Sequence, residues 1–310
     1  MTVLQRQPSH DLGRRLGRLK RQRRAAILAH NYQLAEVQDA ADVVGDSLAI
    51  ARQARRVEAE TIVLCGVHFM AETAKILNPE RTVLVPDANA GCPLADMVTS
   101  QALAEAKRDW PEAAVVCYVN SSAAVKALSD ICCTSSNAVR VVESIPAEQP
   151  ILFVPDASLG DYVARRTGRG NLVPWPGYCP THHRILPEHV AARREEYPGA
   201  QVCVHPECLP DVVAMADFVG STSQIIRHVA ESAAEAFIIC TEGGICHRLR
   251  QANPGKTIVE VSRLATCPNM KRNTLEKVVW CLEERAPEVR VPEAVARRAR
   301  RAIERMLEVG

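Results

Sequence analysis

Short apolar runs that end in polar or aromatic side chains recur along this chain. The first lies at 26–29, and similar runs follow at 115–117 and 202–204. Runs of this length without a polar interruption are typical of strands that are buried on both faces, as in a parallel sheet. The residues that end the three runs are spaced by 88 and 87 positions, and they are His30, Tyr118 and His205.

Each of these runs is followed by the same order of features. An aspartate comes twelve residues after the end of the run, and a hydroxyl residue comes five residues after the aspartate. We interpret the aspartates as turn residues that precede short strands, and the hydroxyl residues as helix N-caps that also face a ligand. The aspartates are Asp42, Asp130 and Asp217, and the hydroxyl residues are Ser47, Ser135 and Thr222.

Two further apolar runs, separated by a helical stretch, complete each repeat. In the first repeat they lie at 62–65 and 83–85. Strands alternating with helices predict an α/β fold of three α/β/α three-layer domains with parallel sheets, related by pseudo-threefold symmetry around a central site. No low-complexity linker separates the repeats, so we expect them to pack closely. The predicted segments are a basic N-terminal helix (1–24), three α/β repeats (25–110, 111–198 and 199–272) and a C-terminal helical segment (273–310).

A Cys-Pro pair follows the last strand of each repeat. Cys92, Cys179 and Cys267 are spaced by 87 and 88 positions. Three thiolates that meet at one point can hold three irons of a [4Fe–4S] cluster and leave the fourth iron open as a Lewis acid. Together with His182 they would instead make a closed Cys3His zinc site. The remaining alternative, three buried core thiols, is disfavoured by the repetition of the Cys-Pro pair.

The amino-acid composition and net charge limit the classes of molecule that we expect this protein to bind. The net charge is +2, which gives no long-range attraction to nucleic acid or acidic membranes, and no apolar run approaches the roughly 18 residues that span a bilayer. The basic clusters at 14–24 and 297–301 are interleaved with apolar residues at helical spacing, so we interpret them as solvated helix faces. With twelve cysteines and no recognisable secretory signal, we expect a cytoplasmic protein with reduced thiols.

Parallel α/β sheets bind ligands beyond the carboxyl ends of their strands. If the three sheets turn these ends inward, strand-end residues and Cys-Pro loops line one central pocket. Each histidine taken alone could be an ordinary core residue, and Glu207 could simply start a helix, but their number favours acid–base chemistry. The strand-end candidates are His30, Tyr32, Ser47, Tyr118, Asn120, Ser135, His205, Glu207 and Thr222.

Several motifs between residues 25 and 285 then point to one family. They are Ala29-His30-Asn31-Tyr32-Gln33, the segment 67–74, the segment 86–92, Tyr118-Val119-Asn120-Ser121, the segment 133–137, Gly177-Tyr178-Cys179 with His182, His205-Pro206-Glu207-Cys208, Gly220-Ser221-Thr222 and Cys267-Pro268-Asn269-Met270-Lys271. In this order they resemble the quinolinate synthases. No position that carries the chemistry departs from the resemblance.

The resemblance implies an enzyme of de novo NAD biosynthesis. It would condense iminoaspartate (iminosuccinate) with dihydroxyacetone phosphate, releasing phosphate and water to give quinolinate. It also implies a [4Fe–4S] cluster on Cys92, Cys179 and Cys267. Tyr32, His182, His205 and Glu207 would be catalytic, and the residues around iminoaspartate would be His30, Ser47, Tyr118, Asn120, Ser135, His205, Glu207 and Thr222. Whether an L-aspartate-oxidising partner supplies the unstable imine stays open.

A second class of function is a metal-loaded module that binds or senses a small carboxylate without converting it. Such a module would bind its ligand and form no product, and it could hold zinc in place of iron and sulfide. The enzyme is favoured because several histidines, a tyrosine and a glutamate in one pocket exceed what simple carboxylate retention requires.

Overall fold

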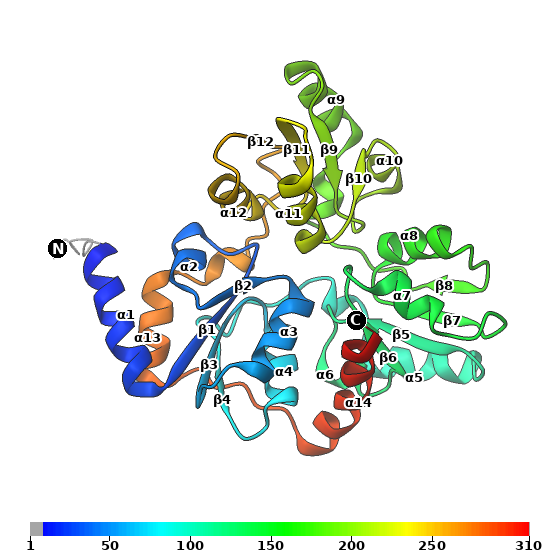
Figure 1. Ribbon diagram of the computed structural model, residues 1–310. Coiled ribbons are helices and arrows are strands. Elements are labelled where there is room, and N and C mark those ends of the chain that lie inside the picture. The colour runs from blue at the N-terminus through cyan, green and yellow to red at the C-terminus, as the bar shows by residue number, and fades with distance from the viewer. Residues whose placement is uncertain (1–8, 310) are drawn as a thin grey trace, which may run out of the picture.

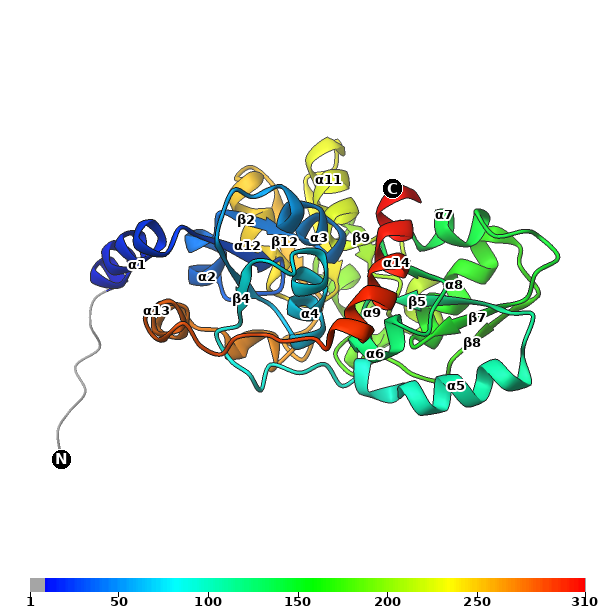
Figure 2. The ribbon, with the colours of Figure 1, turned by 90° about the horizontal axis from the view of Figure 1, so that it is seen from below.

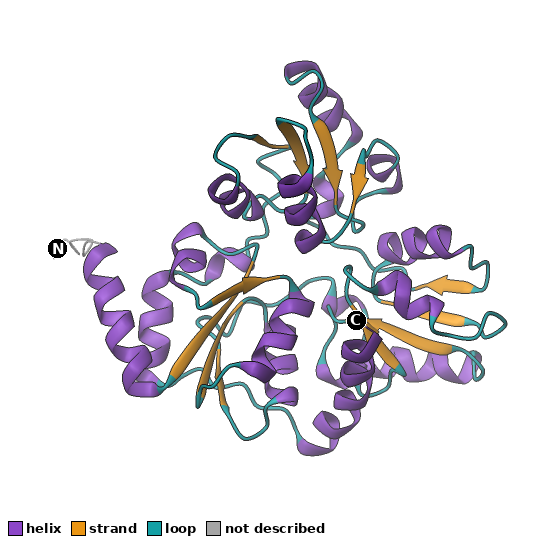
Figure 3. Cartoon of the chain, viewed as in Figure 1, coloured by secondary structure: helices purple, strands orange, loops and turns teal. Residues whose placement is uncertain are grey.

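Three four-stranded parallel sheets surround the middle of the molecule (Figure 1 and Figure 3). The computed structural model describes residues 9–309, so residues 1–8 of the predicted N-terminal helix lie outside the described residues. The three sheets share one strand order, which is β2-β1-β3-β4, β6-β5-β7-β8 and β10-β9-β11-β12. The predicted α/β class and its threefold repeat are confirmed. We call each sheet with its helices unit 1, unit 2 or unit 3; the predicted domain boundaries stay a prediction.

The elements of each unit alternate between strand and helix. Unit 1 contains α1 (Ser9–Arg23), β1 (Ala25–His30), α2 (Ala35–Ala40), β2 (Val43–Gly45), α3 (Ser47–Arg56), β3 (Thr61–Cys65), α4 (His68–Leu77), β4 (Thr82–Leu84) and the 3₁₀ turn η1 (Ala95–Met97). Unit 2 contains α5 (Ser100–Asp109), β5 (Ala114–Tyr118), α6 (Ala123–Lys126), β6 (Ile131–Cys133), α7 (Ala138–Glu143), β7 (Ile151–Val154), α8 (Ala157–Thr167), β8 (Leu172–Pro174) and η2 (His182–Arg184).

Unit 3 repeats the pattern and leads into two closing helices. Its elements are α9 (Pro187–Glu196), β9 (Gln201–Val204), α10 (Pro210–Val213), β10 (Phe218–Val219), α11 (Thr222–Glu231), β11 (Ala236–Cys240), α12 (Ile245–Ala252), β12 (Thr257–Glu260) and η3 (Met270–Arg272). The closing helices are α13 (Leu275–Glu284) and α14 (Glu293–Val309).

The apolar runs become the buried central strands. Every residue of β3, β5 and β7 is buried, because helices cover both faces of each sheet. Burial of apolar side chains stabilises such strands along their whole length. For this reason their sequences do not alternate between apolar and polar residues. The polar residues begin only where each strand leaves the sheet.

The repeated aspartates bind the backbone of their own sheets. Asp42 lies just before β2, and its carboxylate accepts a hydrogen bond from the Ile27 backbone N–H at 2.8 Å. The same bond joins Asp130 to Val115 at 2.8 Å and Asp217 to Val202 at 2.7 Å. Each aspartate therefore ties the entrance of the second strand to the first strand, which is a structural role.

The predicted N-caps are wrong by one or more positions. Asp46 caps α3, accepting from the Ala49 N–H at 2.8 Å, and Ser221 caps α11. An N-cap must lie outside the helix with extended backbone angles, whereas Ser47 and Thr222 are already the first helical residues. Ser135 lies in the turn before α7, whose N-cap position is Asn137. The hydroxyls of the three predicted caps are thereby available to the cavity described below.

The two closing helices pack against elements that are far from them in the sequence. Helix α13 packs beside α1, and α14 packs against α4 of unit 1 and against α6 and β6 of unit 2 (Figure 2). In α1, Leu12, Leu16 and Leu19 are buried while most of its arginines are exposed. The basic clusters are therefore helix faces, as predicted. None of the helices in residues 9–309 has the length and apolar character that crossing a membrane requires.

Candidate active site

One central cavity of about 160 Å³ lies where the carboxyl ends of the three sheets meet. Its wall is formed by residues that follow the first strand of each unit and by the three Cys-Pro loops. Every residue that the sequence analysis proposed as catalytic, substrate-binding or metal-ligating lines it. These residues are His30, Tyr32, Ser47, Cys92, Tyr118, Asn120, Ser135, Cys179, His182, His205, Glu207, Thr222 and Cys267.

Apart from His182, these residues form rings of three equivalent positions, one from each unit. The residue that ends or follows the first strand is His30, Tyr118 or His205, and two positions later come Tyr32, Asn120 or Glu207. In units 1 and 3 the local turn is the same, since the histidine Nδ1 accepts from the backbone N–H two residues on, at 3.2 Å for Tyr32 and 3.3 Å for Glu207. A neutral imidazole in such a turn carries its proton on Nε2.

The three Cys-Pro thiols share one local geometry. A 3₁₀ turn begins three residues after each cysteine, at Ala95, His182 and Met270. Backbone hydrogen bonds from the start of the turn lower the pKa of Cys92 and Cys267, but burial raises it more, to about 12 for Cys92. Nearby Glu207 and the other thiols also raise the pKa of Cys92 and Cys179.

The donor set of these loops fits a soft metal group. Three thiols from three loops face one cavity, they disfavour one another as thiolates, and each has backbone donors or a histidine beside its sulfur. A bound cationic metal group would offset their mutual repulsion and the cost of burial. The other nine cysteines are buried; eight of them lie in strands or helices, and Cys208 lies in the turn between β9 and α10.

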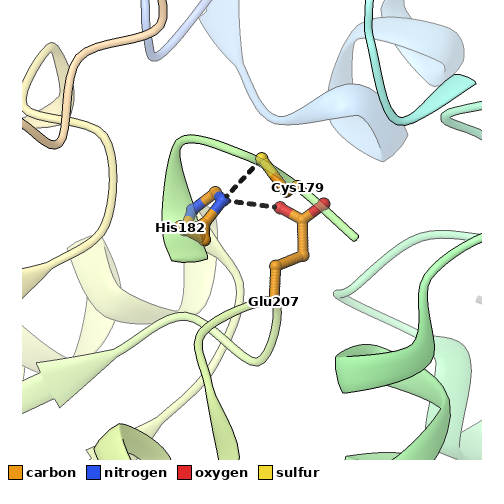
Figure 4. Close-up of side chains that lie close together, drawn as sticks. All are labelled: Cys179, His182 and Glu207. Atoms are coloured by element: carbon orange, nitrogen blue, oxygen red, sulfur yellow. Dashed lines mark hydrogen bonds and ion pairs between the residues drawn. The ribbon is translucent and has the colours of Figure 1, made fainter. Parts of the chain in front are cut away.

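Glu207 stands between two histidines at the centre of the site. Its Oε2 lies 3.2 Å from His182 Nδ1 and 3.3 Å from His205 Nδ1, and the two imidazole rings stack with centroids 4.7 Å apart. His182 Nδ1 is also 3.1 Å from Cys179 Sγ (Figure 4). The three ligand atoms of Cys179, His182 and Glu207 lie within 4.8 Å of one another, close enough to share a metal ion.

Burial sets the protonation of this group. It raises the pKa of Glu207 well above its usual value, with a further rise from Asp156 and a partial decrease from the Tyr118 hydroxyl. Burial lowers the pKa of His182 to about 3 and that of His205 well below its usual value. The imidazoles are therefore neutral near pH 7, and the carboxyl group is suited both to accept and to return a proton.

A threonine that the sequence analysis missed connects this group to Tyr32. Thr241 Oγ1 lies 2.5 Å from Tyr32 Oη and 2.8 Å from His182 Nε2, and all three side chains are buried. On the other side, His205 Nε2 lies 3.1 Å from Ser135 Oγ. Hydrogen bonds thus connect Tyr32, Thr241 and His182, and His182 Nδ1 lies 3.2 Å from Glu207, which gives a buried path from Tyr32 to Glu207. His205 lies on the other side of Glu207 and connects to Ser135.

Two further missed residues hold the Cys267 loop. Glu242 accepts from the Cys267 backbone N–H at 3.1 Å and forms an ion pair with Lys271 at 2.8 Å. Lys271 also donates to the backbone carbonyl of Tyr32 at 2.5 Å, which links the loop to unit 1. Thr241 and Glu242 directly follow β11, so the rule that found the first-strand residues would have found them had it been applied to the third strands.

Comparisons with known proteins identify the family of this chain. The family model described as Quinolinate synthetase A protein matches residues 14–308. A protein named quinolinate synthase from Dehalococcoides mccartyi is 52% identical over 298 residues, covering 96% of this chain and 98% of that protein. The quinolinate synthase of Methanoregula boonei is 53% identical over 290 residues (94% and 95%), and quinolinate synthase 1 of Methanosarcina acetivorans is 51% identical over 299 residues (96% and 98%). The resemblance is thereby confirmed: the chain belongs to the quinolinate synthase family, a family of enzymes.

Proposed function

We propose that this enzyme condenses iminoaspartate with dihydroxyacetone phosphate and releases quinolinate, phosphate and water. The proposal rests on the family and on the chemistry of the central cavity. The reaction requires a dicarboxylate site, groups that move protons during ring closure, and a means of expelling hydroxyl groups. The cavity residues supply the first two of these themselves.

Cys92, Cys179 and Cys267 would hold a [4Fe–4S] cluster. Such a group, when bound by three thiolates, supplies an iron without a protein ligand that acts as a Lewis acid on carboxylate or hydroxyl oxygens. The Glu242–Lys271 pair supports this assignment from the protein side, because it fixes the backbone of Cys267 against unit 1.

Ser47, Ser135 and Thr222 would bind a substrate carboxylate. Ser47 and Thr222 open α3 and α11, where backbone N–H groups and the helix dipole favour an anion. Thr222 Oγ1 accepts from Asn31 Nδ2 at 2.8 Å, so its own hydroxyl hydrogen is directed elsewhere and can be donated to a ligand. His30, Tyr118 and Asn120 would surround the same substrate from units 1 and 2.

Glu207 would be the main general base. Its Oε2 lies 3.2 Å from His182 Nδ1, and Oε1 has no hydrogen-bond partner of normal length in the described chain. A buried carboxylate with one free oxygen gains strongly from taking a proton. This arrangement is the single observation that carries the proposed acid–base role.

Tyr32 would exchange a proton with Glu207 through the buried path. When Glu207 is ionised, the Tyr32 hydroxyl would donate to Thr241 and the Thr241 hydroxyl to His182 Nε2. The proton on His182 Nδ1, which also lies 3.1 Å from Cys179 Sγ, would pass to Glu207 Oε2 at 3.2 Å. A shift of each proton by one position transfers one proton from Tyr32 to Glu207. Thr241 acts through its two neighbours and is a positioning residue.

The test is quinolinate formation by anaerobically prepared, metal-loaded protein. The substrates are dihydroxyacetone phosphate and iminoaspartate generated in the assay, and Cys267→Ser is the control. We expect product from the wild type alone. Binding of a small dicarboxylate without any product, by protein shown to carry iron and sulfide, would favour the binding or sensing module instead.

A further inference from the structure

A second cavity adjoins the central one, and four arginines are among the residues that line it. This basic cavity, of about 600 Å³, contains Arg52 on α3, Arg140 on α7, Arg166 on α8 and Arg227 on α11, so all three units contribute. In Figure 1 the helices α3, α7 and α11 surround the middle of the molecule. The only acidic residue in its lining is Asp46.

The arginines are concentrated here although the whole chain is almost neutral. The net charge is +2, so four guanidinium groups around one cavity do not follow from composition. Some basic residues of α1 form ion pairs, as Arg15 does with Glu283 and Lys20 with Asp42. In the described chain no carboxylate forms an ion pair with Arg52, Arg166 or Arg227, so these three charges are available to a ligand.

The basic cavity and the central cavity share a wall. Asp46 and Ser135 line both of them. Behind this wall the Ser136 hydroxyl donates to Asp46 at 2.6 Å and lies 2.7 Å from Ser221 Oγ, which joins the three units by short side-chain hydrogen bonds. A molecule in the basic cavity would therefore stand directly beside the substrate site.

The two cavities differ in the charged side chains that line them. The central cavity has three carboxyl groups, Asp46, Glu207 and Glu242, and a single arginine, Arg184. A phosphate dianion therefore finds more cationic partners in the basic cavity, where guanidinium groups can bind its oxygens in pairs. Clefts of one charge sign also raise the local concentration of ligands of the opposite sign.

We propose that the basic cavity is a second binding site, which receives phosphate-bearing small molecules beside the active site. The identity of the ligand rests on the proposed function, in which one substrate carries a phosphate group and inorganic phosphate is released. Anion binding itself rests only on the arginines and the cavity. The ligand is either a triose phosphate, bound as substrate before it enters the active site, or inorganic phosphate, bound as product after it leaves.

The test compares two double variants of the metal-loaded protein. Arg52→Gln/Arg227→Gln removes two charges from the basic cavity, and Arg297→Gln/Arg298→Gln removes two exposed charges from α14. Binding of inorganic phosphate and of dihydroxyacetone phosphate is measured separately by calorimetry at low and at physiological salt. We expect the first variant to bind phosphate about tenfold or more weakly than the wild type, and the α14 variant to bind like the wild type.

Kinetics distinguishes the two sources of phosphate. If the site receives substrate, the first variant raises KM for dihydroxyacetone phosphate more than it lowers kcat; if it receives product, inhibition by added phosphate weakens instead. Equal phosphate binding by all three proteins, or no binding by the wild type, would overturn the proposal. Arginine-dependent phosphate binding in a protein that makes no quinolinate would leave this site standing and refute the proposed function. Thermal unfolding checks that both variants remain folded.

Discussion

Aspartate at one end of the sheets and cysteine at the other both repeat in all three units, but they have different roles. The aspartates Asp42, Asp130 and Asp217 lie at the amino ends, where each binds the backbone of its own sheet. The Cys-Pro cysteines lie at the carboxyl ends, where all three face one cavity. A residue type that repeats therefore marks an equivalent position in the fold, whatever its role. Repeated residues that also face the shared cavity, as the cysteines do, are the candidates for chemistry, and those that do not are structural. The following experiments test that distinction, from the largest expected effect to the smallest.

The strongest test compares two cysteines of the same chain. Cys267→Ser removes one converging thiol, so we expect iron and sulfide content and product formation to fall by about a hundredfold or more while the fold persists. Cys203→Ala, within β9, should keep its metal and lose only about 1 kcal/mol of stability through lost packing. Metal analysis, product assay and thermal unfolding measure this. Equal metal content in both variants would contradict the assignment.

Glu207→Gln tests the chemistry of the cavity apart from its metal. The amide keeps the shape of the carboxylate but cannot accept the proton, so kcat should fall by about 10²–10⁴. Iron content, measured on the same samples, should stay at the wild-type level. A parallel loss of iron and of kcat would identify Glu207 as a structural or ligating residue.

His30 should make stability depend on pH in the metal-free protein. Burial lowers its pKa to about 4, against roughly 6.5 in the unfolded chain. Between these values the unfolded state binds more protons, so the His30 contribution falls by about 1.4 kcal/mol per pH unit as the pH drops from 6.5 towards 4. His30→Asn should lack this component, as urea unfolding at several pH values will show. An identical pH dependence in both proteins would mean that folding does not change the pKa of His30.

Thr241 should matter through the two groups that it connects. Thr241→Val keeps the shape but leaves Tyr32 and His182 without their shared partner, so we expect kcat to fall about 10–100-fold with little change in KM. Thr241→Ser restores the hydroxyl and should recover most of the activity. Nitrogen NMR should show an altered His182 tautomer in the valine variant alone. A serine variant as impaired as the valine variant would point to packing.

Asp130→Ala tests the other end of the sheets. It removes one hydrogen bond to the Val115 backbone, which should cost about 1 kcal/mol of stability and leave kcat unchanged. Urea unfolding and the product assay measure the two quantities. A large loss of activity at unchanged stability would show that the amino ends also take part in the chemistry.

The repeated strands and the lining of the central cavity could be predicted because both follow local rules. Uninterrupted apolar runs locate buried strands, and the polar residue after each run locates the carboxyl end. The N-caps were wrong since a hydroxyl at Ser47 or Thr222 resembles a cap in sequence, and only backbone angles distinguish a cap from a first helical residue. Local patterns do not give those angles.

The remaining features depend on contacts between units. Thr241 is meaningful only because unit 3 brings it to Tyr32 of unit 1, 209 residues away in sequence. The same holds for Lys271, which reaches Tyr32 from the Cys267 loop, and for the arginines of the basic cavity. The periodicity of apolar and polar residues within one segment gives no information on such contacts between units.

The rings of three equivalent residues also bear on how this site could have diversified. In a symmetric trimer of separate chains, a mutation would change all three members of a ring at once. With three copies on one chain each member can change alone, and the ring of Tyr32, Asn120 and Glu207 holds a phenol, an amide and a carboxyl group at equivalent places. A single covalent chain thus turns a symmetric scaffold into an asymmetric site, in which each substrate can meet a different functional group.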